Sequence, residues 1–286
     1  MQLARYLPNL LLRHKVVELL IRFGFQERII KLHFNSSVKA FIDLNDPEPR
    51  NIFIKGNFDL DFFDIANCLL PEKGVYFDLG ANFGLCTFGL VPQKKDAKYH
   101  LFEANDYLIK FIKKSVKLYP TTSFNVNHGC LNNEDGESNF QIVNTQSGQS
   151  HVSTNNKTGK KVKNIVLDNY CSIHEISHVD FAKIDLEGHE LKVLEGWRSH
   201  LQKHYVKSII IEVIPENQKR YGLKTNECLI FLELMGYDLY FFKPEDLKKD
   251  SRTTTVNING QNIILSKFLS SEYPVDLSTD ILALSP

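Results

Sequence analysis

The chain has 286 residues, of which 43% are hydrophobic and 24% are charged, as is usual for a globular protein. Thirty-four basic residues balance thirty-four acidic residues, so no overall positive charge favours nucleic acid, and we expect no nucleic-acid partner. No apolar run approaches the roughly 20 residues needed to cross a bilayer. We therefore expect no stable membrane insertion.

Cysteine usage indicates the redox compartment. The cysteines are five in number, widely spaced and without a CxxC pair, which is typical of reduced thiols rather than of disulfides or a zinc site. We therefore expect a cytoplasmic protein. The five are Cys68, Cys86, Cys130, Cys171 and Cys228.

The first part of the chain predicts an extension that precedes the main domain. Apolar positions in residues 4–33 recur at helical spacing and predict two amphipathic helices broken near Gly24. We interpret them as a lid or scaffold packed on the main domain, with a membrane-surface or partner helix as the alternative. Residues 38–54 predict two short strands around a turn at 46–49, and residues 58–70 predict a helix.

From Val75 onward, strand and helix patterns alternate. This order is typical of parallel strands with crossover helices, and it predicts an α/β protein with a doubly wound, mostly parallel sheet. Strands after the last helix predict an antiparallel hairpin at the sheet edge. We expect residues 1–50 to form the helical and short-strand extension, and residues 51–286 to form the main, cofactor-binding domain.

The strands expected in this domain are 75–79, 98–103, 123–128, 138–143, 162–167, 179–185, 206–213, 237–242, 253–258, 262–264 and 281–284. The helices expected between them are 83–91, 105–118, 168–176, 189–202 and 217–235.

A doubly wound sheet binds its ligand at the carboxyl ends of its strands, where the winding reverses. The first residue to end a strand is Asp78, which runs into a turn punctuated by Gly80 and Gly84. The glycines permit a tight bend and close approach of the next helix. The Asp78 carboxylate would repel a pyrophosphate, whereas it can pair with an ammonium group. The turn is therefore predicted to hold the amino-acid end of a cofactor through Asp78, Gly80, Ala81, Asn82 and Gly84.

Glu103 ends the next strand, some 20 residues after the turn, where an acid chelates ribose hydroxyls. Ala104 follows it, and Gly129 and Cys130 follow the third strand at the same sheet edge, so these residues complete the predicted cofactor site. S-adenosylmethionine carries an amino acid, a ribose and a sulfonium cation, and it matches this set. A nicotinamide cofactor is disfavoured, because the turn does not read GxGxxG.

A second stretch places three carboxylates and a histidine where a strand ends and a helix starts. Asp185 is our first candidate for a general base and also a candidate cofactor contact, with Glu187 and His189 as rival bases. Glu190 is interpreted as a charge that favours the helix N-terminus. We assign no metal, and a Mg²⁺ or Ca²⁺ ion held by Asp185, Glu187 and Glu212 is the alternative.

These motifs resemble those of the FkbM-type methyltransferase family, in order and spacing, over roughly residues 50–285. The stretches that carry the resemblance are Asp78-Leu-Gly-Ala-Asn-Phe-Gly84, Phe102-Glu103, Val166-Leu167-Asp168, and Lys183-Ile-Asp-Leu-Glu-Gly-His-Glu190 with Val193-Leu194-Glu195-Gly196. The chain departs from the family at Ala104, where proline is frequent, and the first 35 residues lie outside the resemblance.

The resemblance implies a class I S-adenosylmethionine-dependent fold and the methylation of a hydroxyl on a sugar, a lipid-linked glycan or a polyketide-type product. The acceptor is accordingly expected to be a small molecule or a glycan, recognised by residues 144–163, the N-terminal helices and residues 55–63. Two alternatives are a nucleotide-dependent oxidoreductase on a similar sheet and a non-catalytic cofactor-binding module. The sequence leaves the oligomeric state open.

Overall fold

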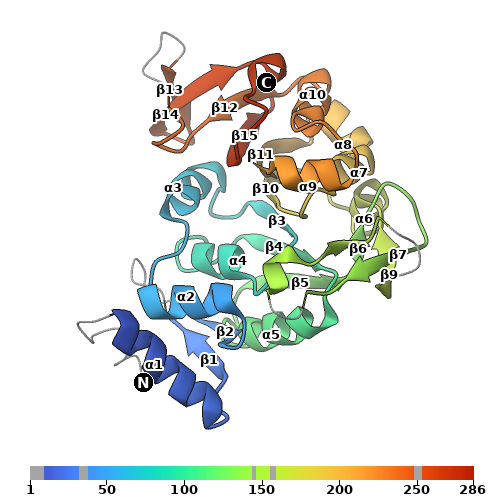
Figure 1. Cartoon of the computed structure of the whole chain (residues 1–286). Coiled ribbons are helices and arrows are strands. Elements are labelled where there is room, and N and C mark those ends of the chain that lie inside the picture. Colours follow the sequence, from blue (N-terminus) through green and yellow to red (C-terminus); the bar gives the residue numbers. More distant parts are fainter. Residues whose placement is uncertain (1–9, 32–37, 144–145, 155–158, 248–252) are drawn as a thin grey trace.

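The computed structural model describes residues 10–31, 38–143, 146–154, 159–247 and 253–286. Their largest element is a nine-stranded sheet with the strand order β13-β14-β12-β15-β11-β10-β3-β4-β5 (Figure 1). Its strands are β3 (Val75–Leu79), β4 (Lys98–Glu103), β5 (Ser123–His128), β10 (Val179–Ile184), β11 (Val206–Val213), β12 (Asp238–Phe241), β13 (Thr253–Ile258), β14 (Gln261–Phe268) and β15 (Thr279–Leu284).

The pairing of these strands confirms the predicted fold class. From β11 through β10, β3 and β4 to β5 all neighbours are parallel, while β15 lies antiparallel between β11 and β12. β13 and β14 form the antiparallel hairpin expected at the edge. The chain proceeds from β3 outward to β5 and then returns to β10 on the other side of β3. The winding therefore reverses between β3 and β10, which is where a ligand crevice is expected.

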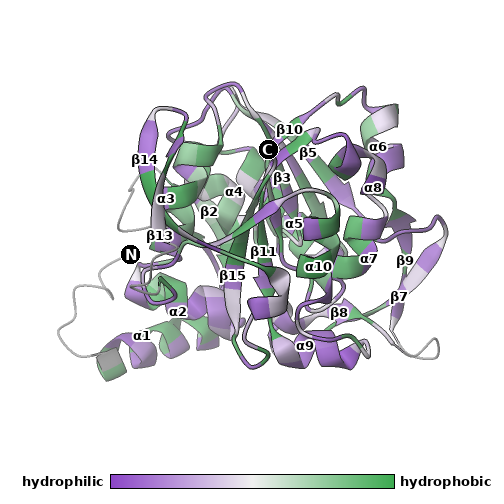
Figure 2. Cartoon of the chain, turned by 90° about the horizontal axis from the view of Figure 1, so that it is seen from above, coloured by the Kyte–Doolittle hydropathy of each residue, from purple (hydrophilic) through white to green (hydrophobic). Residues whose placement is uncertain are grey.

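Helices cover both faces of the sheet, as Figure 2 shows from above. One face packs against α3 (Leu60–Leu69), α4 (Leu85–Leu90) and α5 (Asp106–Val116), and the other against α6 (Leu167–Ile173), α7 (Glu190–Glu195), α8 (Arg198–Gln202) and α10 (Glu227–Leu234). In β3, Tyr76 packs into the first layer and Phe77 and Leu79 into the second, because successive side chains of a strand point to opposite faces. A strand buried on both faces is mostly apolar, which explains its sequence apart from the buried Asp78.

A second, four-stranded sheet follows β5. Its order is β6-β9-β7-β8, with β6 (Cys130–Leu131), β7 (Glu137–Gln141), β8 (His151–Val152) and β9 (Lys160–Ile165). The strands expected near 138–143 and 162–167 therefore exist, but they pair antiparallel with each other instead of joining the main sheet. Among the described residues of the connection, no α-helix separates the two strands that could return the chain to a parallel position. A helical turn, η2 (Ser147–Gln149), lies between β7 and β8.

After Gly24 the secondary structure of the N-terminal region differs from the prediction. α1 (Leu10–Arg22) is present, but the second predicted helix is wrong, because the chain forms β1 (Glu27–Ile30), which pairs antiparallel with β2 (Ala40–Asp43). Gly24 adopts a left-handed φ of 77° and ends the helix. Among the described residues, no helix is both long and apolar enough to cross a membrane.

The predicted strand over residues 51–54 is also wrong, since this segment belongs to the helix α2 (Pro47–Lys55). Asp46 caps the helix by accepting a hydrogen bond at Oδ1 from the N–H of Glu48, at 3.1 Å. Proline at the first helical position has its φ preset for the helix. These two signals outweigh the strand propensity of the apolar residues that follow. α2 crosses residue 50, so the division of the chain at that point stays a proposal.

Two predicted long helices are each divided. The segment 189–202 forms α7 and α8, and the segment 217–235 forms α9 (Pro215–Arg220) and α10. Gly196 follows α7 and lies so close to the loop after β6 that a Cβ would stand 2.4 Å from the Asn132 carbonyl oxygen. Gly222 has a φ of 73° after α9, a conformation that ends a helix.

The indole of Trp197 is fully buried and stacks on the Phe77 ring, with centroids 5.5 Å apart and planes 1° apart. We predict that Trp197→Ala lowers the free energy of unfolding by about 3–5 kcal/mol, because the cavity left cannot refill. Ile173→Ala, at a side chain that is 77% exposed, is the control and should change it by about 0.5 kcal/mol or less. Urea denaturation measures both, and equal values would contradict the prediction.

Candidate active site at the carboxyl ends of the strands

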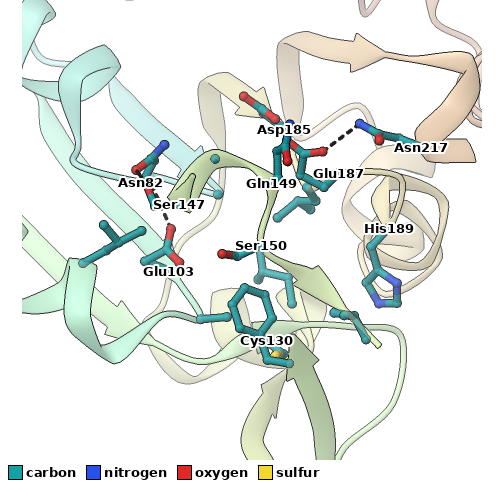
Figure 3. A pocket seen from close by; sticks show the side chains of 18 of the residues that line it. Asn82, Glu103, Cys130, Ser147, Gln149, Ser150, Asp185, Glu187, His189 and Asn217 are labelled. Carbon is teal, nitrogen blue, oxygen red and sulfur yellow. Dashed lines mark hydrogen bonds between the residues drawn. The ribbon is translucent and has the colours of Figure 1, made fainter. Parts of the chain in front are cut away.

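A cavity of about 500 Å³ lies at the predicted switch point. Its walls come from the turns after β3, β4, β5, β10 and β11, from α2 and from η2 (Figure 3). The predicted site residues that line it are Gly80, Asn82, Glu103, Ala104, Gly129, Cys130, Asp185, Glu187 and His189. The structure therefore brings together nine of the predicted residues from four segments of the chain.

The glycine turn after β3 touches the turn after β10 directly. Gly80 has a φ of 86°, and a Cβ at this position would lie 1.9 Å from the carbonyl oxygen of Asp185. Gly84, with a φ of 75°, starts α4, and a Cβ there would lie 2.6 Å from the Phe88 ring. Only glycine fits at these two positions. Both therefore allow the tight turn that the sequence predicted, although Gly84 does not line the cavity.

Glu103 is held by two backbone N–H groups. Its Oε2 accepts a hydrogen bond from Asn82 N and its Oε1 one from Asn105 N, each at 2.8 Å. Burial raises the pKa of Glu103 to about 7 in spite of these bonds. The carboxylate thus joins the turn after β3 to the turn after β4, and its remaining lone pairs can accept ribose hydroxyls.

The cavity wall beside Glu103 is apolar and consists mainly of residues with small side chains. It contains Ala104, Gly129 and Cys130, with Leu108 and Phe140 next to them. The thiol of Cys130 is buried, and burial raises its pKa to about 12, so it stays protonated. A wall of this kind accepts the flat face of a base such as adenine.

Asp78 and Ala81 lie behind the main cavity, where they line a smaller adjoining pocket with Lys183 and Cys86. Asp78 is buried, and its Oδ2 accepts a hydrogen bond from Thr87 Oγ1 at 2.6 Å. Its Oδ1 has no hydrogen-bond partner among the described residues. A buried carboxylate oxygen of this kind requires a donor, so contact with an ammonium group stays the prediction for Asp78.

Three carboxylates meet where β10 and β11 end. One oxygen each of Asp185, Glu187 and Glu212 lies within 4.8 Å of the others. Asp185 Oδ2 accepts a hydrogen bond from Lys183 Nζ at 2.7 Å, and Glu187 Oε2 accepts one from Asn217 Nδ2 at 2.8 Å (Figure 3). Three carboxylates this close cannot all be ionised without a further cation or shared protons.

The pKa values of this cluster reflect burial and mutual repulsion. Burial and the charge of Asp185 raise the pKa of Glu187 to about 7. The same two causes raise the pKa of Glu212 well above its ordinary range. Glu187 therefore exchanges a proton near neutral pH, while Glu212 keeps its proton. A shared divalent cation would replace these protons, and the metal alternative stays open on this geometry.

Glu190 determines the shape of the turn that carries Glu187. Its Oε1 accepts hydrogen bonds from the N–H groups of Leu186 and Gly188, each at 3.0 Å, and its Oε2 accepts one from Gln218 Nε2 at 2.6 Å. Glu187 has a φ of 57°, which is unfavourable for a residue with a side chain. The bonds of Glu190 on both sides hold this conformation, which extends its predicted role at the helix N-terminus.

His189 lies against Tyr221, with ring centroids 5.4 Å apart, and in Figure 3 its ring points away from the carboxylates of Asp185 and Glu187. It is 7% exposed, and burial lowers its pKa to about 4, so the imidazole is neutral. Neither ring nitrogen has a hydrogen-bond partner among the described residues. Both ring nitrogens are therefore available for a hydrogen bond with a ligand, and a role for His189 as base stays a prediction.

The sequence missed several residues of the site. Glu48, from α2, lines both pockets, and burial followed by repulsion from Asp185 raises its pKa. Asn217 and Arg220 reach the cavity from α9. Only the helix cap at Asp46 and Pro47 could have indicated that residue 48 sits on a helix, and no local signal marks the contact of α9 with the turn after β10.

Loop residues 146–150 cover the cavity, as expected for the part of the polar segment that is described. Ser147 N donates a hydrogen bond to Asp46 Oδ2 at 2.8 Å, and Ser147 Oγ donates one to Asn82 Oδ1 at 3.2 Å. The loop is thereby bound both to the cap of α2 and to the glycine turn. Residues 144–145 and 155–158 of the same predicted segment lie outside the described residues.

A sequence model of the methyltransferase FkbM domain matches residues 78–239. The chain belongs to the FkbM methyltransferase family. The match begins at Asp78 and includes the glycine turn, Glu103 and the carboxylate cluster. Members of this family use S-adenosylmethionine, and the alternative of a nucleotide-dependent oxidoreductase is thereby set aside. The site fits this cofactor at the buried oxygen of Asp78, which has no hydrogen-bond partner among the described residues, and at the cavity that Gly80 and Glu103 line.

A curated relative is similar over part of its length. Hexuronic acid methyltransferase AglP of Haloferax volcanii is 29% identical over 154 residues, which cover 52% of this chain and 61% of that protein. The alignment thus spans less than two thirds of the relative.

Solved structures show more distant likenesses. Precorrin-6y C5,15-methyltransferase from Geobacter metallireducens is 10% identical with a TM-score of 0.41, and 79% of this chain and 89% of that chain are covered. A TehB-like SAM-dependent methyltransferase from Corynebacterium glutamicum is 14% identical with a TM-score of 0.40, and 78% and 94% are covered.

The raised pKa of Glu103 predicts how cofactor binding depends on pH. Above its pKa of about 7 the Glu103 carboxylate is ionised and would accept hydrogen bonds from the ribose hydroxyls, whereas below that value it takes up a proton. We therefore expect the affinity for S-adenosylhomocysteine to fall by up to about tenfold per pH unit below that value. Glu103→Gln should weaken binding by about 1.5–3 kcal/mol and remove the pH dependence.

Isothermal titration from about pH 5.5 to about pH 8 measures both effects. The exposed Glu134→Gln should bind as the unaltered chain does. A Glu103→Gln variant with full affinity would overturn the assignment of the ribose site.

Proposed function

We propose that the chain is an S-adenosylmethionine-dependent O-methyltransferase that methylates a hydroxyl of a sugar, glycan or natural-product acceptor. The observation that carries this proposal is the carboxylate cluster of Asp185, Glu187 and Glu212. The cluster lines the same cavity as Glu103 and the glycine turn. Carboxylates accept hydrogen bonds from sugar hydroxyls, and one of them can take the proton that an alcohol must lose.

The charge of the cavity supports a hydroxyl acceptor over an acidic one. Glu48 lies at the cavity together with the three clustered carboxylates. Arg220 also lines the cavity, but its guanidinium already donates to Glu187 O at 2.8 Å and to Asn217 Oδ1 at 3.2 Å. A uronic acid is the type of molecule in the name of the Haloferax relative. Its carboxylate would be disfavoured here, because burial and repulsion from Asp185 already raise the pKa values of Glu48, Glu187 and Glu212. A neutral polyol would not.

Glu187 is the strongest candidate for the base. Its pKa of about 7 lets it be ionised in the resting enzyme and still accept a proton. Asp185, our first candidate from the sequence, is paired with Lys183 at 2.7 Å. Its Oδ2 is thus already engaged by a cation within the protein. His189, with a pKa of about 4, holds a proton poorly at neutral pH.

S-adenosylmethionine supplies a methyl group on a sulfonium cation. Glu187 would take the proton of the acceptor hydroxyl while the oxygen forms its bond to the methyl carbon. The cofactor would supply the methyl group and leave as S-adenosylhomocysteine, and Glu187 would keep the proton of the resulting methyl ether's former hydroxyl. Glu190 and Asn217 would keep the Glu187 carboxylate in place during this step.

The base assignment predicts the pH profile of turnover. Glu187 must be ionised, so kcat should rise with pH through about 7 and level off above it. Glu187→Gln should lower kcat by about 10²–10⁴-fold and abolish this rise, while binding of S-adenosylhomocysteine stays near normal. The assay follows the release of S-adenosylhomocysteine with a panel of neutral sugars, amino sugars and uronic acids.

Glu216→Gln, at an exposed position of the same helix that carries Asn217, is the matched control and should keep full turnover. Normal turnover in Glu187→Gln would pass the role to Asp185, which Asp185→Asn would then test. Cofactor binding without turnover on any acceptor would support a non-catalytic binding module instead.

Metal removal gives an independent test, because we assign the proton transfer to Glu187 itself. Treatment with EDTA should leave kcat unchanged within about twofold, since no step requires a cation. A loss of activity that Mg²⁺ or Ca²⁺ restores would contradict this expectation and assign the clustered carboxylates to a metal. Titration of the protein with Mn²⁺, followed by electron paramagnetic resonance, would show binding without reference to turnover.

A further inference from the structure

The outer side of α1 carries an apolar stripe. Leu12, Leu19 and Phe23 are 43%, 53% and 69% exposed. Their spacing of seven and then four residues places them on one side of the helix and of the turn that ends it. The opposite side of α1 packs inward through Val17, which is fully buried. The stripe is thus additional to the contacts that hold α1 on the protein.

Exposed apolar side chains are concentrated in this part of the molecule. Of the fifteen large hydrophobic residues that are exposed among the described residues, six lie between positions 11 and 29. The six are Leu11, Leu12, Leu19, Phe23, Phe25 and Ile29. Single exposed apolar residues are normal on a protein surface, whereas a contiguous group of them indicates contact with another apolar phase.

Basic residues border the stripe. On α1 itself, Arg13, Lys15 and Arg22 against Glu18 give a net charge of +2, in a chain whose net charge is zero. Lys15 and Arg22 are exposed and lie on the helix side next to the stripe.

The helix α5 adds to this positive charge. Lys110, Lys113, Lys114 and Lys117 are exposed on and just after α5. Lys114 Nζ lies 2.5 Å from Glu27 Oε2 at the start of β1, which follows α1 directly. In Figure 1, α1, β1 and α5 all lie toward the lower side of the molecule. The ion pair of Lys114 with Glu27 connects α5 to the strand that follows α1.

We propose that this region, formed by the stripe of α1 and the lysines of α5, docks on the surface of a membrane that contains anionic lipids. A helix with apolar side chains on one side and basic ones beside them lies in the lipid interface, where the apolar groups reach the acyl boundary and the cations meet phosphate headgroups. The aliphatic stems of lysine and arginine extend toward those headgroups. Docking of this kind is peripheral and requires no membrane-spanning helix.

A membrane fits this region better than a protein partner. Three partly exposed side chains offer much less surface than the roughly 800 Å² per partner that a stable protein interface buries. A lipid interface has no such minimum, because apolar insertion and charge attraction add side chain by side chain.

Docking would also bring the catalytic cavity to the membrane. α1 packs against α2, and α2 carries Glu48 into the cavity wall. An acceptor attached to a lipid would then meet the cavity at the membrane surface. This consequence rests on the proposed function, whereas the docking itself does not.

Vesicle co-sedimentation of the whole chain tests the docking. We expect binding to vesicles of phosphatidylcholine with phosphatidylglycerol, little binding to phosphatidylcholine alone, and a loss of binding between about 0.05 M and about 0.5 M salt. Leu19→Ser with Phe23→Ser should weaken binding by about tenfold or more. Lys15→Gln with Arg22→Gln should weaken it to a similar extent.

Ile173→Ser and Leu234→Ser, at side chains that are 77% and 74% exposed on α6 and α10, are the matched controls and should bind as the unaltered chain does. Circular dichroism melting of each variant identifies any loss of folding. Absence of binding to anionic vesicles, or binding that the α1 variants leave unchanged, overturns the proposal. So does a dimer in light scattering that Leu19→Ser with Phe23→Ser converts to monomer, because the stripe would then be covered by a second copy. None of these readouts depends on methyl transfer.

Discussion

The site depends on the direct contact between two backbone turns. Asp185 N donates a hydrogen bond to Leu79 O at 3.0 Å, which extends the parallel pairing of β3 and β10 by one residue beyond the strands. The absence of a side chain at Gly80 lets the Asp185 carbonyl fill the space that a Cβ would need. The glycine turn and the carboxylate cluster are therefore held next to each other by the backbone, so the proposed seat of the cofactor's amino-acid end lies beside the acids that we propose for the acceptor.

The contact between the turns brings several carboxyl groups close together, and the cation of Lys183 offsets part of their mutual repulsion. Although burial alone would lower its pKa, Asp185 and Asp78 hold the pKa of Lys183 well above the ordinary value, so it remains a cation. It lies on β10, two residues before Asp185, and contacts that carboxylate from within the protein. A positively charged cofactor adds to the same balance from the cavity side. The protein thus holds a fixed cation on the inner side of the acids, while their cavity side is free for a ligand.

The sequence predicted best the features that depend on local pattern. β3, β4, β5, β11 and β13 have the predicted bounds, because each is a short apolar or alternating run between turn residues. Asp185, Glu187 and Glu103 were found because the carboxyl ends of parallel strands share one edge. The approach of Glu48 and Asn217 could not be predicted, since it follows from how α2 and α9 pack. The strand expected at residues 51–54 shows that the cap at Asp46 carries more weight than the apolar run after it.

The position of β15 has a consequence for how the sheet is held together. This strand comes after β12, β13 and β14 in the sequence, yet it lies between β11 and β12, pairing with six residues of one and three of the other. β12 and the β13–β14 hairpin therefore have no hydrogen-bonded neighbour in the main sheet until β15 is inserted. The far edge of the sheet is therefore joined to the parallel half through β15 alone. A change that removes this last strand would detach β12 and the β13–β14 hairpin from the half of the sheet that carries the site.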